Sequence, residues 1–334
     1  FGYQINNILR IENYFNYSDL FLEYDSVNPS NSDNNSTDDT QGIYSGKFII
    51  DNGNLKNTFS FNKTYFLRNV MDYNKSPVQE NYESTRESIN LLGQYNFNLD
   101  TRIIYGLENE FDKAEIPSNY PTGSTYQSAV YIQREENINS QYIDLQFKPW
   151  RQINSTLGFR RDDHSLAGDY NTGRFTLAYN LDNYSKVRSS FGTGLRFPSL
   201  NEYYFGSSVK DSSSLKPEKS RSFDFGIDVY DPIKKINLSA TIYRINYENY
   251  IGSWAKNTDN GNTWVQKNTN AINRSSGIEI LSSWEMQKDL NIDLGYTYSS
   301  SHDGSTCSNP DDTCNASQNV RIPRHSIMSS ISKK

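Results

Sequence analysis

Short segments in which apolar and polar residues alternate run through this chain, and the connections between them are alternately short and long. The connection at 51–54 (Asp-Asn-Gly-Asn) is short, whereas 25–41 and 112–136 are long and polar. Alternation with a period of two indicates strands with one apolar and one polar face. Long loops at one end and short turns at the other are typical of a transmembrane β-barrel. A soluble sandwich has no reason to keep this asymmetry over about fourteen strands.

The composition agrees with a barrel. Only 35% of the residues are hydrophobic, and the sequence has no run of 18 apolar residues that would make a transmembrane helix. A barrel strand needs only about 9–11 residues, of which every second one faces lipid. The 25 Tyr and 17 Phe suit the aromatic girdles at the two membrane interfaces. A tyrosine-rich secreted β protein is the alternative.

Charge and motif content argue against nucleic-acid binding and against catalysis. The formal net charge is -6 and both signs are mixed along the chain, whereas a nucleic-acid-binding protein is expected to have a basic stripe. His164 follows Asp162 and Asp163, and we interpret this group as the polar tip of a hairpin rather than a metal or acid–base site. The chain has no glycine-rich phosphate loop and no serine in a nucleophile-elbow context. We therefore expect no enzyme activity.

Five ordered motifs between Arg161 and His325 carry a family resemblance. The stretch 192–204 reads G-T-G-L-R-F-P-S-L-N-E-Y-Y and 215–220 reads L-K-P-E-K-S. The remaining motifs are R-D-D-H-S with N-T-G-R at 161–174, N-A with G-I-E at 270–279, and R-I-P-R-H at 321–325. Together they resemble the TonB-dependent outer-membrane receptors, most closely the cobalamin/siderophore group. The chain departs from the family at Phe197-Pro198, usually Ala-Pro, and at Tyr203-Tyr204, usually Leu-Tyr.

The resemblance implies an all-β, antiparallel transmembrane barrel. This chain would supply about fourteen strands of a barrel of about 22. Residues 1–334 would then form one partial barrel domain, and the family's N-terminal plug domain would lie outside it. The chain begins at Phe1 without a Met and ends at Lys334 within a strand pattern. We therefore expect an internal fragment of a longer receptor.

The resemblance also implies a function. The receptor would bind a scarce metal chelate at the outer membrane of a Gram-negative bacterium and import it with energy delivered by the TonB complex. That complex would act through the missing N-terminal region, and membrane lipid would surround the barrel. Cobalamin is the first expectation, a ferric siderophore the second and haem the third. A structural or adhesive surface β protein and a passive porin are the alternatives from other classes.

Aromatic residues near the predicted loops are the candidate ligand contacts. Large rings can stack on a flat, partly apolar chelate. We expect the contacts to come from Tyr203, Tyr204, Trp254 and Trp264, with Arg196 setting the orientation of the ligand. The two tryptophans fit an interface girdle equally well. Arg196 has an alternative role too, as an ion-pair partner of Glu202 or of other neighbours.

Cys307 and Cys314 are expected to form a disulfide within one long loop. Pro310, Asp311 and Asp312 between them favour a turn that lets the two ends meet. A zinc site is less favoured because His302 is not at a finger-like spacing.

No cofactor is required for the expected function. The resemblance allows calcium in one acidic loop, because some cobalamin receptors order a loop in this way and Ca²⁺ takes about 6–8 oxygen ligands. A solvated acidic loop is the alternative. The carboxylates concerned are Asp25, Asp33, Asp38 and Asp39.

Overall fold

The computed structural model describes residues 1–24, 35–72, 78–117, 131–204, 215–256, 264–268, 273–302 and 322–333. Within these ranges, strands alternate with turns, and one short helix follows β10. The elements are β1 Gly2–Gln4, β2 Leu9–Tyr24, β3 Asn35–Asp51, β4 Leu55–Asp72, β5 Val78–Asn96, β6 Thr101–Pro117, β7 Tyr131–Trp150, β8 Ile153–His164, β9 Gly168–Asn180, β10 Ser185–Arg196, α1 Leu200–Tyr204, β11 Glu218–Asp231, β12 Ile236–Glu248, β13 Ile251–Lys256, β14 Trp264–Asn268, β15 Asn273–Gln287, β16 Leu290–His302 and β17 His325–Lys333.

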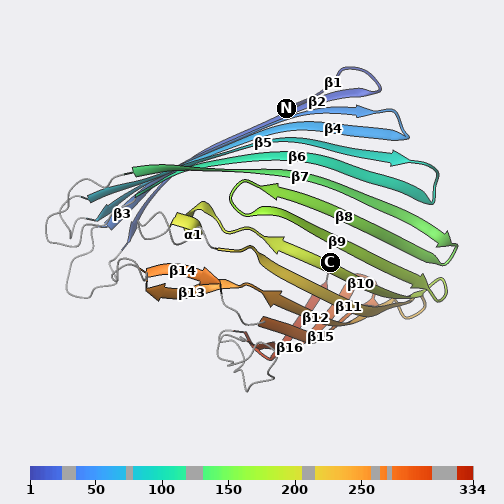
Figure 1. Ribbon diagram of the computed structural model, residues 1–334. Coiled ribbons are helices and arrows are strands. Elements are labelled where there is room, and N and C mark those ends of the chain that lie inside the picture. Colours follow the sequence, from blue (N-terminus) through green and yellow to red (C-terminus); the bar gives the residue numbers. More distant parts are fainter. Residues whose placement is uncertain are drawn as a thin grey trace.

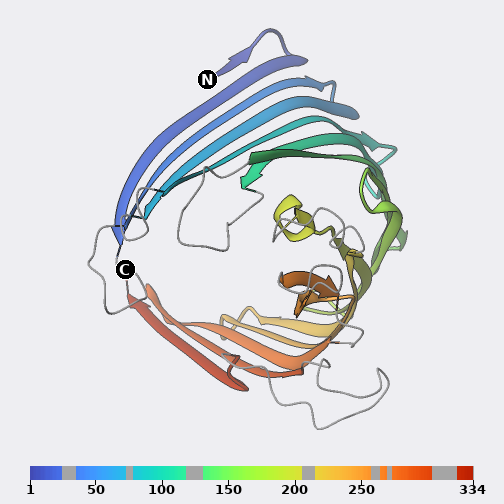
Figure 2. The same cartoon turned by 60° about the vertical axis from the view of Figure 1, so that its left-hand side comes forward.

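Fifteen of these strands form one antiparallel sheet in chain order, and β13 pairs with β14 in a separate hairpin. The sheet curves around a lumen, but it is not closed, since β1 and β17 lie at its two edges (Figures 1 and 2). The predicted all-β antiparallel barrel architecture is confirmed. In the described ranges, no helix has the length and apolar character needed to span a membrane.

The convex face of the sheet carries an apolar belt. The strand register places Leu157, Phe175, Phe191 and Phe223 side by side on β8, β9, β10 and β11. Between 42% and 50% of each of these side chains is exposed. Large apolar side chains exposed in a continuous row are unfavourable in water and suit a hydrocarbon environment. The register therefore sets out a lipid-facing band.

The concave face is polar and hydrogen-bonded. Ser140 on β7 pairs in register with Asp162 on β8, and its hydroxyl donates a 2.6 Å hydrogen bond to that carboxylate. Arg160, two residues earlier on the same face, donates to Asp162 at 2.8 Å. Asp162 is 5% exposed. Buried carboxylates need such donors, because an unpaired buried charge is very costly. The lumen wall is therefore held by side chains that satisfy one another.

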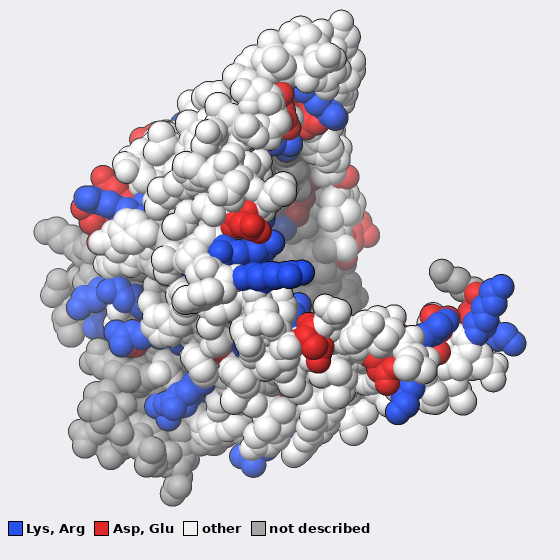
Figure 3. Space-filling model, turned by 90° about the vertical axis from the view of Figure 1, so that its right-hand side faces the viewer, with Lys and Arg blue, Asp and Glu red and all other residues white. Residues whose placement is uncertain are grey.

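Short turns at one end of the sheet are closed by side chains that accept backbone hydrogen bonds. Asp182 accepts from the N–H groups of Tyr184 and Ser185, both at 2.7 Å. Asp231 accepts from Ile233 and Lys234 at 2.9 and 3.0 Å. These Asx turns explain why each connection is so short. Figure 3 shows this end of the molecule, where charges of both signs are interspersed with uncharged surface.

Two expected long strands are interrupted. The alternation predicts continuous strands over 235–254 and 263–285, but β12 ends at Glu248 and β13 begins at Ile251. Asn249 between them adopts a left-handed φ of 58°. Asparagine tolerates that conformation better than most residues. The chain then leaves the main sheet, and the β13–β14 hairpin lies within the curve of the sheet (Figure 2).

We expect Gly277→Ala to destabilise the barrel by about 1–3 kcal/mol, the usual range for overpacking. A Cβ at Gly277 on β15 would lie 2.2 Å from the backbone oxygen of Tyr298 and 2.7 Å from the Tyr243 hydroxyl. The matched control is Gly42→Ala on β3, where a Cβ would have no neighbour within 4 Å. Urea unfolding of the full-length receptor in detergent checks both variants. Equal stability losses at the two positions would contradict the packing argument.

Candidate functional site

The segment 196–204, which we call the mouth segment, leaves β10 and folds back at the long-loop end of the sheet. Pro198 has no N–H to donate to a ladder, and it is fully buried. Ser199 and Glu202 then form a reciprocal pair. The Glu202 carboxylate accepts from the Ser199 N–H at 2.8 Å, and the Ser199 hydroxyl accepts from the Glu202 N–H at 3.2 Å. This capping box starts α1 directly after the proline.

Arg196 fastens the mouth segment to β11. Its guanidinium donates to both carboxylate oxygens of Glu218 at 2.7 and 2.8 Å. It also donates to Glu202 at 2.9–3.2 Å. These hydrogen bonds raise the pKa of Arg196 well above its ordinary value. One guanidinium thus ties the end of β10, α1 and the start of β11 together.

Glu218 connects this group to the β13–β14 hairpin. Its Oε1 accepts a 2.8 Å hydrogen bond from the N–H of Ile251, the first residue of β13. Burial by itself raises the pKa of Glu218, but the hydrogen bonds from Arg196 and Ile251 outweigh it and hold the pKa below its ordinary value. The carboxylate is therefore an ionised bridge between two segments at the long-loop end.

Asn268 holds the hairpin from its other strand. The Nδ2 of Asn268 donates to the carbonyl oxygens of Asn249 and Lys216 at 2.6 and 2.8 Å. Its Oδ1 accepts from the Lys216 N–H at 2.7 Å. These bonds explain why the expected strand over 235–254 breaks at Asn249, since the backbone there is turned toward the segment before β11.

A small apolar cluster lies between these segments. Tyr203 of α1, Leu215 before β11 and Ile251 of β13 are 3–5% exposed and contact one another. Burial of each large side chain contributes about 1.5–3 kcal/mol. The cluster therefore holds α1 and the hairpin together on the lumen side of the wall.

The structure brings most of the predicted ligand-contact positions to one place. Tyr203 and Tyr204 end α1, while Trp254 pairs with Gln266 and Trp264 with Lys256 in the β13–β14 hairpin. Figures 1 and 2 show α1 and this hairpin at the long-loop end, within the curve of the sheet. The 3% exposure of Tyr203 leaves a ligand little surface on its ring. Arg196 is half exposed and ion-paired. Ligand contact by these five residues remains a prediction.

His164 differs from the expected polar tip. It does end β8 at a hairpin, but it is only 1% exposed. Its ring lies 4.3 Å from the Phe197 ring and 6.4 Å from the Tyr203 ring, centroid to centroid. Because the polar residues Asp162 and Asp163 directly precede His164, the sequence favoured an exposed tip. The alternation along β8 places His164 on the lumen face, and that signal could have revealed it.

Below the mouth segment, the lumen wall has carboxylates that share arginines. Arg160 contacts Glu108 and Asp162, each at 2.8 Å. Arg86 contacts Asp112 at 2.5 Å and Glu110 at 3.5 Å. A cavity of about 430 Å³ lies against this wall, and Glu108, Glu110, Arg160, Asp162 and Phe197 are among the residues that line it.

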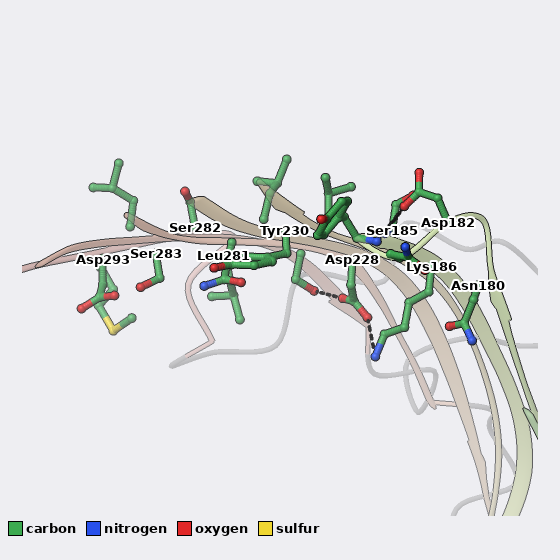
Figure 4. A pocket seen from close by; sticks show the side chains of 18 of the residues that line it. Asn180, Asp182, Ser185, Lys186, Asp228, Tyr230, Leu281, Ser282, Ser283 and Asp293 are labelled. Atoms are coloured by element: carbon green, nitrogen blue, oxygen red, sulfur yellow. Dashed lines mark hydrogen bonds and ion pairs between the residues drawn. The ribbon is translucent and has the colours of Figure 1, made fainter. Parts of the chain in front are cut away.

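A second hollow of about 650 Å³ lies toward the short-turn end (Figure 4). Asp228 is at its centre, where it accepts from the Ser239 hydroxyl at 2.7 Å and lies 3.6 Å from Lys186 Nζ. Leu281 and Ser283 of β15 and Asp293 of β16 also line this hollow. It lies at the opposite end of the wall from the mouth segment.

The calcium and disulfide predictions fall largely outside the described residues. Asp25, Asp33, Cys307 and Cys314 are all outside them. Asp38 and Asp39 belong to β3, and Asp39 accepts two hydrogen bonds from the Arg68 guanidinium, at 2.6 and 2.9 Å. Among the described residues, no group of three or more potential metal ligands is present. Loop calcium and the disulfide remain predictions.

Comparison with known proteins gives one family. The family profile described as "TonB dependent receptor-like, beta-barrel" matches residues 1–329. The vitamin B12 transporter BtuB of Vibrio vulnificus is 33% identical over 150 residues, which cover 45% of this chain and 23% of that protein. BtuB of Photobacterium profundum is 27% identical over 140 residues, 42% of this chain and 22% of that protein.

Solved structures share the fold. The siderophore receptor PirA of Acinetobacter baumannii has a TM-score of 0.79 at 14% identity, covering 100% of this chain and 55% of PirA. The ferripyoverdine receptor of Pseudomonas aeruginosa has a TM-score of 0.73 at 15% identity, covering 100% of this chain and 51% of that receptor. The chain thus spans about half the length of these receptors.

We expect Arg196→Lys to loosen the mouth segment. An ammonium cannot reproduce the two-pronged hydrogen bonds to Glu218 while also reaching Glu202. Hydrogen exchange of the amides in 196–204 should accelerate about tenfold, corresponding to about 1.4 kcal/mol. Arg161→Lys is the control, because its pair with Asp169 is exposed on both sides and such pairs contribute little. Unchanged exchange in Arg196→Lys would remove Arg196 from this role.

The contact between Glu218 and Ile251 should depend on pH. A lowered folded-state pKa means that the stabilisation is fully present above the unfolded value of about 4.3 and is lost as the pH falls through the folded value. Protection of the Ile251 amide, corrected for intrinsic exchange, should therefore drop at acidic pH. In Glu218→Gln that drop should disappear. A pH dependence that is the same in both proteins would assign it to another group.

Proposed function

Because this chain belongs to the TonB-dependent receptor β-barrel family, we propose that it is part of a receptor in the outer membrane of a Gram-negative bacterium that binds a metal chelate and imports it. The family consists of receptors and transporters. Energy for import comes from the TonB complex, acting through a region outside this chain. Residues 1–334 are one partial barrel domain of that receptor, and the plug that fills the lumen lies outside it.

The placement of α1 and the β13–β14 hairpin carries this proposal. Both sit at the long-loop end on the lumen side, fastened to the wall by Arg196, Glu218 and Asn268. A passive porin or an adhesive surface protein has no need of side-chain ties that hold elements across the lumen entrance. A receptor needs such rigid elements, because recognition requires side chains held in place by their neighbours.

Cobalamin is the favoured chelate. The matching relatives from V. vulnificus and P. profundum are vitamin B12 transporters. In addition, Arg86, Arg160 and Arg196 near the mouth each contact two carboxylates. Guanidinium groups bound in this way have little capacity left for a polyanionic ferric chelate. The wall instead offers carboxylate oxygens, which accept hydrogen bonds from uncharged amide groups such as those on a corrinoid.

A ferric siderophore is the second candidate. It is supported by the fold likeness to PirA and to the ferripyoverdine receptor. The likeness at 14–15% identity extends to the fold alone. Haem is a third candidate with no specific feature in its favour. We propose no catalytic step and no required cofactor.

We expect the hairpin tryptophans to contribute to chelate binding. In the full-length receptor, replacing both Trp254 and Trp264 by Ala should weaken cobalamin binding at least tenfold, about 1.4 kcal/mol. The control is Trp150→Ala, at the β7–β8 turn of the opposite end, which is 69% exposed. Calorimetric titration of purified receptor with cyanocobalamin, and separately with a ferric siderophore, measures the affinities.

The outcomes separate the parts of the proposal. A wild-type receptor that binds a ferric chelate and no corrinoid contradicts the substrate while the receptor function stands. A receptor that binds neither contradicts both. Unchanged affinity in the correctly inserted tryptophan variant removes the hairpin from the binding site.

A further inference from the structure

His164 lies where four separate segments meet. It ends β8, it contacts the β8–β9 turn, its imidazole faces Glu136 of β7, and its ring packs at a tilt against Phe197 of the mouth segment. Tyr203 of α1 is the next ring beyond it. A residue with this many neighbours from distant parts of the chain fixes how those parts sit relative to one another.

The hydrogen bonds of His164 determine which ring nitrogen carries its proton. Nδ1 accepts from the backbone N–H groups of Leu166 and Ala167 at 3.0 and 3.2 Å. Backbone amides can only donate, so Nδ1 must have a free lone pair. The imidazole is therefore neutral with its proton on Nε2. Protonating Nδ1 would break both turn hydrogen bonds.

The proton on Nε2 points into a buried space beside a carboxylate. Nε2 lies 3.4 Å from Glu136 Oε2, and the two side chains are only 0% and 7% exposed. Neither atom closes a hydrogen bond within the described part of the chain. A buried donor or acceptor without a hydrogen bond costs about 1–3 kcal/mol. An apolar residue of similar size could keep the ring contact with Phe197, but it could not accept the two hydrogen bonds of the turn.

We propose that His164 is a positioning residue for chelate recognition, in which the Nε2-protonated imidazole, held by the Leu166 and Ala167 amides and facing Glu136, orients Phe197 and thereby the mouth segment. This inference rests on the proposed receptor function. The hydrogen bonds from the turn fix the orientation of the His164 ring. Phe197 therefore packs against a ring that cannot rotate freely. Because Phe197 directly follows Arg196, its position also sets where the guanidinium meets Glu202 and Glu218.

Two variants of the full-length receptor separate the ring from its hydrogen bonds. His164→Phe keeps a ring against Phe197 but leaves the Leu166 and Ala167 amides without their acceptor. His164→Asn keeps a short acceptor for those amides but removes the ring. Each is expected to weaken cyanocobalamin binding about tenfold while the assembled barrel is retained, as judged by its heat-modifiable mobility. His325→Phe is the matched control, because His325 lies on β17 and is exposed.

A double-mutant cycle tests whether His164 acts through Phe197. If it does, His164→Asn in a Phe197→Ala background should cause no further loss of affinity, whereas independent contributions would add. A merely stabilising residue would lower barrel stability in all backgrounds equally and leave affinity unchanged.

Nitrogen NMR of histidine-labelled wild-type receptor tests the tautomer without any mutation of the site. The His164 signals, assigned by their loss in His164→Asn, should show an unprotonated Nδ1 and a protonated Nε2. A protonated Nδ1 overturns the inference, and so does wild-type affinity in either assembled His164 variant. If neither variant assembles, the His164 signals are identified by their response to Glu136→Gln, and wild-type affinity in an assembled Phe197→Ala variant overturns the inference. A wild-type receptor that binds neither cyanocobalamin nor a ferric siderophore contradicts the proposed function instead.

Discussion

The need to pair every backbone N–H and C=O across neighbouring strands underlies this structure. In hydrocarbon an unpaired backbone group costs several kcal/mol, so a membrane-spanning sheet must form continuous ladders. The fifteen-stranded sheet does so with antiparallel neighbours in chain order. Because side chains alternate along such a ladder, the register places the apolar side chains of the belt, from Leu157 to Phe223, outside. The same register places Arg160 and Asp162 inside.

The polar concave face then creates its own requirement. Charges that line a wall must be paired, and the wall meets this by letting one guanidinium serve two carboxylates, as at Arg86, Arg160 and Arg196. These shared ion pairs connect different parts of the structure along the wall. Arg86 links the adjacent strands β5 and β6, and Arg160 links β8 to β6 across β7, whereas Arg196 links the sheet to a segment that leaves it. The mouth segment is thus an extension of the wall's ion pairing rather than a free loop.

The residues that identify the family in the sequence are mostly structural in this fold. Pro198, Glu202, Leu215 and Glu218, together with Tyr203, where the chain departs from the motif, build the connection between β10, α1, β11 and β13. His164 of the upstream motif closes the same group from the β8–β9 side. The β13–β14 hairpin that carries Trp254 and Trp264 is attached to this frame. In the proposed receptor, a chelate would therefore meet a hairpin that is held in place by these side chains.

The sequence by itself determined the fold class, the antiparallel pairing of neighbours and the two faces of the sheet, because these follow from local alternation and connection length. It predicted the pairing of Arg196 with Glu202 as one alternative, since those residues are close along the chain. Only the tertiary structure decided that Tyr203 and His164 are buried and that the expected strand over 235–254 breaks at Asn249. These features depend on Glu218, Asn268 and Phe197, which lie far from their partners in sequence. A pattern of period two specifies which face a side chain takes, but not which distant segment will cover it.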